Sequence, residues 1–162
     1  PVSTVGSHVS ASPNHQTRRR TPLETRGTVA MAGSFGYELD LSQMTEEEQD
    51  IIRHQVEEYK QYYDLIHNGK YYRLSSPYED CRATAWAFVS EDKKECLFCA
   101  VMTKLQANPD AVIIKLKGLE PKQRYRMGDK VYTGEALMYG GYLLPIPEEE
   151  YPSWRVYFRA EE

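Results

Sequence analysis

An amphipathic helix over residues 45–67 is the strongest structural signal in the sequence, and it divides the chain into two parts with different patterns. Thr45 and Glu48 have the spacing of a capping box, which marks the first turn of a helix. Apolar residues then recur every three or four positions along one face: Ile52, Val56, Tyr59, Tyr63 and Ile66. Asn68-Gly69 is a typical helix end. We therefore predict an α+β chain with a boundary after this helix, between residues 1–70 and residues 71–162.

The part before the helix contains two apolar stretches, residues 2–11 and 28–41, with a long polar segment between them. This pattern predicts a strand, a loop and a second strand, which leads into the helix. Gly27, Gly33 and Gly36 interrupt the second stretch and would allow another segment of backbone to approach closely. A long loop inside a compact domain is often functional.

From about Tyr71 onward the sequence is typical of short strands joined by turns. Residues 83–90 and 95–103 are predicted strands, and the polar residues 91–94 form a hairpin turn between them. Further strands are expected over residues 112–117, 123–127, 130–133 and 153–159. Short strands with regular turns predict an antiparallel β-sandwich.

Length and charge exclude several classes of protein. A chain of 162 residues is too short for a complete eight-stranded α/β barrel, which needs about 250 residues. The net charge of −4 disfavours a nucleic-acid or anionic-membrane partner. The three consecutive arginines of residues 18–20 are only weak evidence for a phosphate or nucleic-acid site. No apolar run approaches the length of about 20 residues that crosses a bilayer. We expect neither a nucleic-acid nor a membrane partner.

The three cysteines are Cys81, Cys96 and Cys99. Cys96 and Cys99 have the formal spacing of a zinc or redox motif, but they fall in a predicted strand, where side chains alternate between faces. The two thiols would then point in opposite directions and could not share a metal ion. We predict buried reduced thiols, no metal site and a cytoplasmic location.

Four motifs stand before the helix: His8-Val9-Ser10, Pro13-Asn14-His15-Gln16, Thr21-Pro22-Leu23 and Phe35-Gly36-Tyr37-Glu38-Leu39-Asp40. Together they resemble the bacterial α-galactosidases (melibiases) of glycoside hydrolase family 36, which remove terminal α-galactose from melibiose and raffinose-type sugars. The resemblance is specific over residues 1–72 and looser beyond them.

The resemblance implies that the chain is the C-terminal piece of such an enzyme: the last βα unit or two of a (β/α)8 barrel, followed by a closing β-sandwich. Its partners would be the rest of the catalytic barrel and the α-galactoside substrate of the parent, with homo-oligomer formation left open. The parent would be a retaining glycosidase without metal or organic cofactor. The family's two catalytic aspartates lie in upstream motifs that do not occur here. The chain therefore holds no catalytic residue of the family, and we expect the isolated chain to be inactive.

Asn14 and His15 are the candidate substrate-binding residues. If residues 2–11 form a barrel strand, the following loop lies on the side of the barrel that receives substrate. The two polar side chains would then form part of the pocket rim. The alternative is a loop whose asparagine binds its own backbone. Arg18 stands where the family usually has glycine, and we expect the loop to take a different course there because arginine is strained at positive φ.

Glu38 and Asp40 are a second candidate pair, since glycoside hydrolysis normally uses two carboxyl groups. Two residues apart on one strand, they would share a face. The resemblance places the family's catalytic residues on earlier strands, which favours a structural role for both.

A different class of function also fits the sequence: a stand-alone carbohydrate-binding or assembly β-sandwich without hydrolase activity. Its stacking platform would use the aromatic residues Trp86, Trp154, Tyr157 and Phe158. Trp86 and Phe88 alternate on one strand face, however, which favours a role in the core.

Overall fold

The helix that the capping box indicates is present as α2 (Glu46–Asn68) in the computed structural model, which describes residues 2–76, 78, 82–106, 110–145 and 150–161. Thr45 accepts a hydrogen bond from the Glu48 backbone, and the Glu48 side chain accepts one from the Thr45 backbone, so both halves of the capping box form. The helix ends at Gly69, whose φ of −71° is not left-handed. Glycine is needed there because an added Cβ would clash with the carbonyl oxygen of Leu65.

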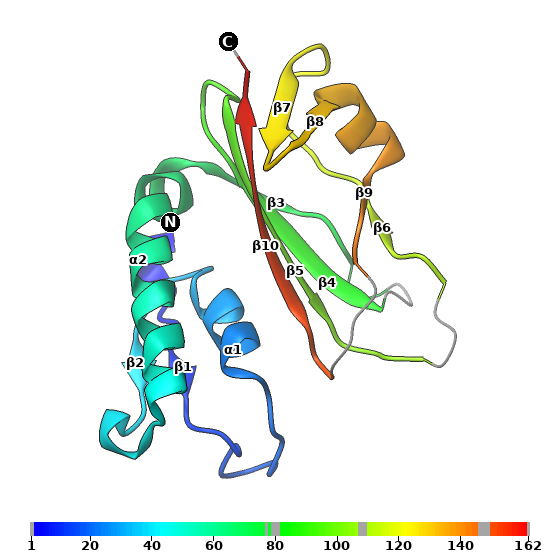
Figure 1. Ribbon diagram of the computed structural model, residues 1–162. Helices are drawn as coiled ribbons and strands as arrows, with labels where there is room; N and C mark the ends of the chain where they lie inside the picture. The colour runs from blue at the N-terminus through cyan, green and yellow to red at the C-terminus, as the bar shows by residue number, and fades with distance from the viewer. Residues whose placement is uncertain (1, 77, 79–81, 107–109, 146–149, 162) are drawn as a thin grey trace.

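The chain up to the end of α2 consists of two strand-then-helix units. Its elements before α2 are η1 (Val2–Thr4), β1 (Val9–Ser10), α1 (Leu23–Ala30), β2 (Tyr37–Glu38) and η2 (Leu41–Gln43). Strands β1 and β2 are parallel neighbours, with Val9 opposite Tyr37, and α1 connects them (Figure 1). The order β1–α1–β2–α2 is therefore the βαβα pattern of α/β proteins.

The prediction for residues 2–11 and 28–41 is wrong in two respects. The strands are only two residues long, and α1 covers residues that were expected to be loop and strand. Helix α1 has no apolar stripe at helical spacing, because its buried face includes Thr25, Gly27 and Thr28 as well as Leu23 and Ala30. Gly27 does not interrupt a strand. It allows α1 to approach α2, since an added Cβ would clash with the Gln55 carboxamide.

The part after α2 is dominated by one antiparallel sheet of six strands, in the order β3-β4-β5-β10-β7-β8. Its strands are β3 (Lys70–Arg73), β4 (Ala83–Val89), β5 (Glu95–Met102), β7 (Arg124–Met127), β8 (Lys130–Thr133) and β10 (Ser153–Ala160). The predicted hairpin of residues 83–103 is confirmed as β4 and β5. The strand expected over residues 112–117 is shorter, because Leu116 donates its backbone hydrogen bond to the carbonyl of Leu137. Only β6 (Ile113–Ile114) forms there, and it pairs with β9 (Tyr142–Leu143).

The two faces of the large sheet are covered differently. On one face Trp86, Phe88 and Leu97 pack with Leu65 and Ile66 of α2. On the other face alternate residues such as Phe98 and Phe158 pack under β6, β9 and the π-helical turn η3 (Ala136–Gly140). Figure 1 shows α1 and α2 on one side of the sheet and β6 and β9 on the other. Among the described residues, no helix is both long and apolar enough to cross a membrane.

Candidate functional site

A polar hollow of about 410 Å³ opens where β1 ends and the loop to α1 begins. Its lining includes His8 and Ser10 from the β1 segment, Asn14 and Arg19 from the loop, and Arg26 from α1. The carboxyl ends of parallel strands are the edge at which α/β folds bind ligands. This hollow is therefore the candidate functional site.

Asn14 lies in the lining of the hollow, whereas His15 is exposed and lies outside it. The Oδ1 atom of Asn14 accepts hydrogen bonds from the backbone of Gln16 at 3.0 Å and of Thr17 at 2.9 Å. The side-chain carbonyl thus organises its own loop, as the alternative interpretation expects. A ligand in the hollow could still contact the amide nitrogen of Asn14.

Arg18 keeps the left-handed conformation that favours glycine. Its φ is 59°, and its backbone N–H donates to the carbonyl of Asn14 at 2.8 Å. The expectation that arginine would force the backbone out of positive φ is therefore wrong. The loop accepts the steric cost because its hydrogen bonds, including Asn14 N–H to the carbonyl of Arg19 at 2.9 Å, close a tight turn around Arg18.

Arg26 fixes both ends of this loop, a role that no local sequence pattern indicates. Its Nε donates to the carbonyl of Thr21 at 3.0 Å, and its Nη1 donates to the carbonyl of Ser10. Burial lowers the pKa of Arg26 and the charge of Glu48 acts against this shift, but a guanidinium stays charged at any ordinary pH. The charged Arg26 side chain thus holds the two ends of the loop, at Ser10 and Thr21, beside the hollow.

Glu38 and Asp40 do not form a carboxylate pair. Strand β2 ends at Glu38, whose Oε2 lies 2.8 Å from Nε2 of His8 on the neighbouring strand segment. Asp40 lies beyond the strand and caps η2, where it accepts hydrogen bonds from Ser42 and Gln43. These hydrogen bonds, chiefly those from Ser42, hold the pKa of Asp40 below its ordinary value. Glu38 thus pairs with a histidine, whereas Asp40 accepts hydrogen bonds within its own turn, and both have structural partners.

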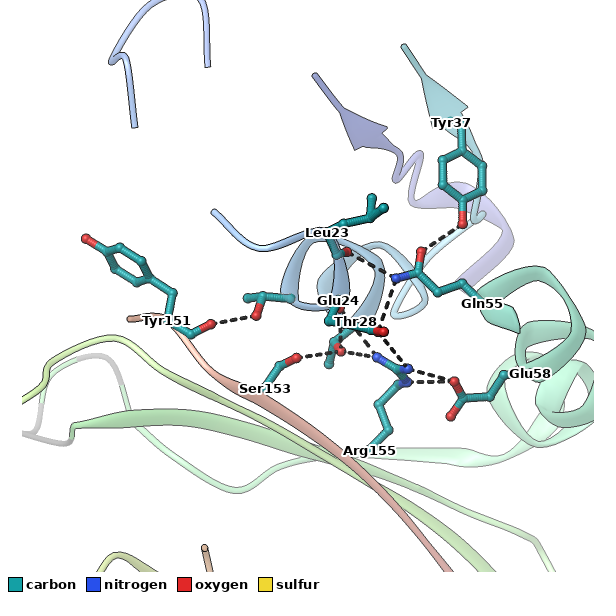
Figure 2. Close-up of polar contacts among 10 residues, drawn as sticks. Leu23, Glu24, Thr28, Tyr37, Gln55, Glu58, Tyr151, Ser153 and Arg155 are labelled. Carbon is teal, nitrogen blue, oxygen red and sulfur yellow. Dashed lines mark hydrogen bonds and ion pairs between the residues drawn. The ribbon is translucent and has the colours of Figure 1, made fainter. Parts of the chain in front are cut away.

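A second polar cluster connects the βα part of the chain (residues 1–70) to the large sheet (Figure 2). Arg155 of β10 reaches across to both helices: its Nη2 lies 2.8 Å from Oε2 of Glu58 on α2 and 3.4 Å from Oε2 of Glu24 on α1. Its Nη1 donates to Oγ1 of Thr28. Burial alone would lower the pKa of Arg155, but the hydrogen bond and charge of Glu58 raise it. Only 12% of the Arg155 side chain is exposed, so this ion pair is well shielded from water.

Gln55 extends the same cluster between the two helices. Its side chain is completely buried; Nε2 donates to the carbonyl of Leu23 at 3.1 Å, and Oε1 accepts from the hydroxyl of Tyr37 at 2.8 Å. Burial, with the charge of Glu24, raises the pKa of Tyr37 to about 12, so the phenol remains a donor. This buried amide links α1, α2 and β2 (Figure 2).

The cysteines that the structure describes are structural. Cys96 and Cys99 are buried on opposite faces of β5, as predicted, so they cannot share a metal ion. Burial raises the pKa of both thiols. Cys81 lies outside the described residues. Within the described ranges, no group of three or more histidine, cysteine or acidic residues could hold a metal ion.

The aromatic residues considered for a stacking platform lie mainly in the core. Trp86 is 6% exposed and packs with Phe88, as predicted, and Phe158 is fully buried. Trp154 and Tyr157 are partly buried on opposite faces of the sheet. Trp154 packs on the face of Phe158, and Tyr157 packs on the face of Trp86. A flat stacking surface of these four residues does not form.

Comparison with known proteins matches both parts of the chain. Residues 1–69 match the family model described as Melibiase, and residues 83–158 match the one described as the glycosyl hydrolase family 36 C-terminal domain. The bifunctional alpha-galactosidase/sucrose kinase AgaSK of Mediterraneibacter gnavus is 44% identical over 160 residues, which are 98% of this chain and 17% of that protein. Alpha-galactosidase AgaA of Geobacillus stearothermophilus is 45% identical over 96% of this chain and 22% of its own length.

Solved structures agree with this relationship. The galactosidase domain of AgaSK superposes with a TM-score of 0.96 at 44% identity, over 99% of this chain and 22% of that one. A variant of AgaA in complex with raffinose gives a TM-score of 0.95 at 41% identity, with the same coverage. The two matched models together account for residues 1–69 and 83–158, and both relatives are named as alpha-galactosidases. The chain belongs to glycoside hydrolase family 36, and it spans about a fifth of the length of these relatives.

Proposed function

We propose that the chain is the C-terminal portion of an α-galactosidase that hydrolyses terminal α-galactosyl residues of melibiose- and raffinose-type sugars by a retaining mechanism. The observation that carries the proposal is the unbroken similarity to AgaSK and AgaA, at 44% and 45% identity over nearly the whole chain. The structure of an AgaA variant with raffinose supports the substrate class. We propose a cytoplasmic location for the enzyme.

Within that enzyme, residues 1–70 would form the last two βα units of the catalytic barrel. The parallel pair of β1 and β2, connected by α1, supports this assignment, because a βαβ crossover is the repeating unit of such barrels. Each strand has one strand neighbour among the described residues, whereas each strand of a closed barrel has two. The rest of the catalytic barrel would supply the missing neighbours and is therefore the expected partner.

Residues 71–162 would form the closing β-sandwich. The large antiparallel sheet supplies one layer, and the small ladder of β6 and β9 packs over one of its faces. The other face packs against α2, the last helix of the proposed barrel. The sandwich would thus support the end of the barrel from outside.

The polar hollow beside β1 would form part of the substrate rim. Its place at the carboxyl end of a barrel strand supports this role, and Asn14 lies in its lining. His15, exposed on the same loop, would reach only a longer oligosaccharide. Rim residues of this kind bind and orient the substrate, while the catalytic carboxylates come from the rest of the enzyme.

The test is hydrolysis of an aryl α-galactoside and of raffinose by the full-length enzyme and by this chain alone. We expect turnover by the full-length enzyme and none by the chain. Turnover by the isolated chain that is lost in Glu38→Ala or Asp40→Ala would contradict the assignment of the catalytic residues. Glycan binding without turnover by the full-length protein would favour a stand-alone binding module instead.

A further inference from the structure

The segment that leads into β10 contacts the loop between β1 and α1 (residues 11–22, the rim loop), although more than 120 residues separate them in the sequence. The guanidinium carbon of Arg19 lies 5.8 Å from the centre of the Tyr151 ring. This is within the range of about 6 Å in which a cation and an aromatic face attract each other. Arg19 also lines the polar hollow. One side chain of the rim therefore rests on a residue of the C-terminal part.

The backbone of Tyr151 is fixed independently of its ring. The Oγ1 atom of Thr25, on α1, donates to the carbonyl of Tyr151 at 2.5 Å. Two residues later, the hydroxyls of Ser153 and Thr28 lie 3.0 Å apart. Tyr151 has a φ of 54°, which is uncommon for a residue other than glycine. Helix α1 thus holds the chain in a constrained conformation that presents the ring to Arg19.

The backbone of the rim loop is similarly fixed, by the Asn14 turn and by Arg26. The side chain of Arg19 is exposed, so it can change rotamer although the backbone of the loop is fixed. An arginine has many rotamers in water, and a ring beneath the guanidinium reduces their number. The contact with Tyr151 therefore determines where a cationic hydrogen-bond donor lies at the hollow.

We propose that Tyr151 is a specificity-determining residue: it positions Arg19 at the rim to donate hydrogen bonds to the leaving-group sugars of an oligosaccharide. This inference rests on the proposed function. Tyr151 acts through Arg19 and is a positioning residue, not a catalytic one. A small aryl leaving group would not extend to Arg19, whereas the glucosyl-fructose part of raffinose would.

The test compares Tyr151→Asn with Tyr151→Phe in the full-length enzyme. Asparagine tolerates positive φ better than most residues, and both variants keep the backbone carbonyl that Thr25 binds. We expect Tyr151→Asn to lower kcat/KM for raffinose by about two- to fivefold more than for an aryl α-galactoside, mainly through KM. Tyr151→Phe retains the aromatic face and should restore the wild-type ratio between the two substrates.

A double-mutant cycle tests whether the effect passes through Arg19. We expect Arg19→Ala to reduce the raffinose-to-aryl ratio by a similar factor, and the double variant with Tyr151→Asn to lose little more. Equal losses on both substrates, or fully additive losses, would overturn the inference and leave the proposed function intact. Wild-type enzyme that hydrolyses neither substrate would instead contradict the proposed function, and this inference with it.

Discussion

The large sheet packs on α2 through buried apolar side chains, whereas α1 is attached to β10 mainly by polar contacts. Strands β4 and β5 carry two buried apolar faces, and β10 adds one apolar face, on which Phe158 is fully buried. Among the described residues, the apolar cluster of the βα part has four buried members, which include Val9 and Ile52. Its attachment to β10 depends on hydrogen bonds and ion pairs around Arg155.

The difference shows that the two helices are held on the sheet by different means, α2 by apolar packing and α1 by directed polar contacts. Apolar contact is non-directional, whereas a guanidinium that binds Glu58, Glu24 and Thr28 together fixes one relative position of α1, α2 and β10. This specificity matters if the position of α1 determines the shape of the rim loop. The Arg155 cluster is also more sensitive to mutation than apolar packing, because loss of one partner leaves a shielded charge unpaired.

The largest expected effect comes from breaking this cluster with Arg155→Met. Glu58 is only 15% exposed and would lose its cation, so we expect a loss of about 3 kcal/mol in the free energy of unfolding. Limited proteolysis of the variant should cut faster within residues 16–23, while the hydrogen exchange of β4 and β5 stays slow.

The matched control for this prediction is Arg53→Met on the exposed surface of α2. Arg53 pairs with Asp50, and both side chains are more than half exposed, so we expect a loss of less than about 1 kcal/mol. Similar losses in both variants, measured by chemical denaturation, would show that the Arg155 cluster does not join the two regions.

A smaller effect is expected at the contact between α1 and α2. In Gly27→Ala the new methyl group would clash with the Gln55 carboxamide, whose hydrogen bonds to Leu23 and Tyr37 prevent it from moving freely. Part of this cost is offset by the better helix propensity of alanine, and we expect a net loss of about 1–2 kcal/mol. Thermal unfolding would measure it.

Gly36→Ala is the control for that substitution within the same region. No heavy atom lies within 4 Å of a Cβ added at Gly36, so its stability should be equal to or slightly above that of the wild type. A destabilised Gly36→Ala variant beside a stable Gly27→Ala variant would reverse our assignment of the close helix contact.

The sequence predicted the elements whose signals are local. The capping box and apolar stripe of α2 and the hairpin of β4 and β5 each lie within a short window, so they could be recognised before any tertiary contact was known. Helix α1 could not, because its buried threonines are acceptable only through partners elsewhere in the chain, such as Ser153 and the carbonyl of Tyr151. The same limit applies to the site. Asn14, which lines the hollow, was proposed from its motif, whereas Arg155 contacts residues about 100 to 130 positions away and leaves no local signal.

The smallest effect concerns strain at two residues with the same backbone conformation, one in each region. Arg18 in the rim loop and Lys93 in the turn between β4 and β5 both have a φ of 59°. Glycine removes the steric cost of this conformation, which is about 1 kcal/mol, but it also gives the unfolded chain more freedom. We expect Lys93→Gly to raise the free energy of unfolding by no more than about 1 kcal/mol, since its exposed pairing with Glu120 contributes little.

Arg18→Gly should relieve the same strain without the same gain in global stability. If the rim loop opens locally before the sheet unfolds, the benefit appears in that local opening and not in the global transition. We therefore expect slower proteolysis within residues 16–23 with a nearly unchanged midpoint in denaturant, the opposite of the result for Lys93→Gly. Equal shifts of the global midpoint in both variants would show that the loop and the sheet unfold as one cooperative unit. The difference between the two regions would then lie in their contacts alone and not in their stability.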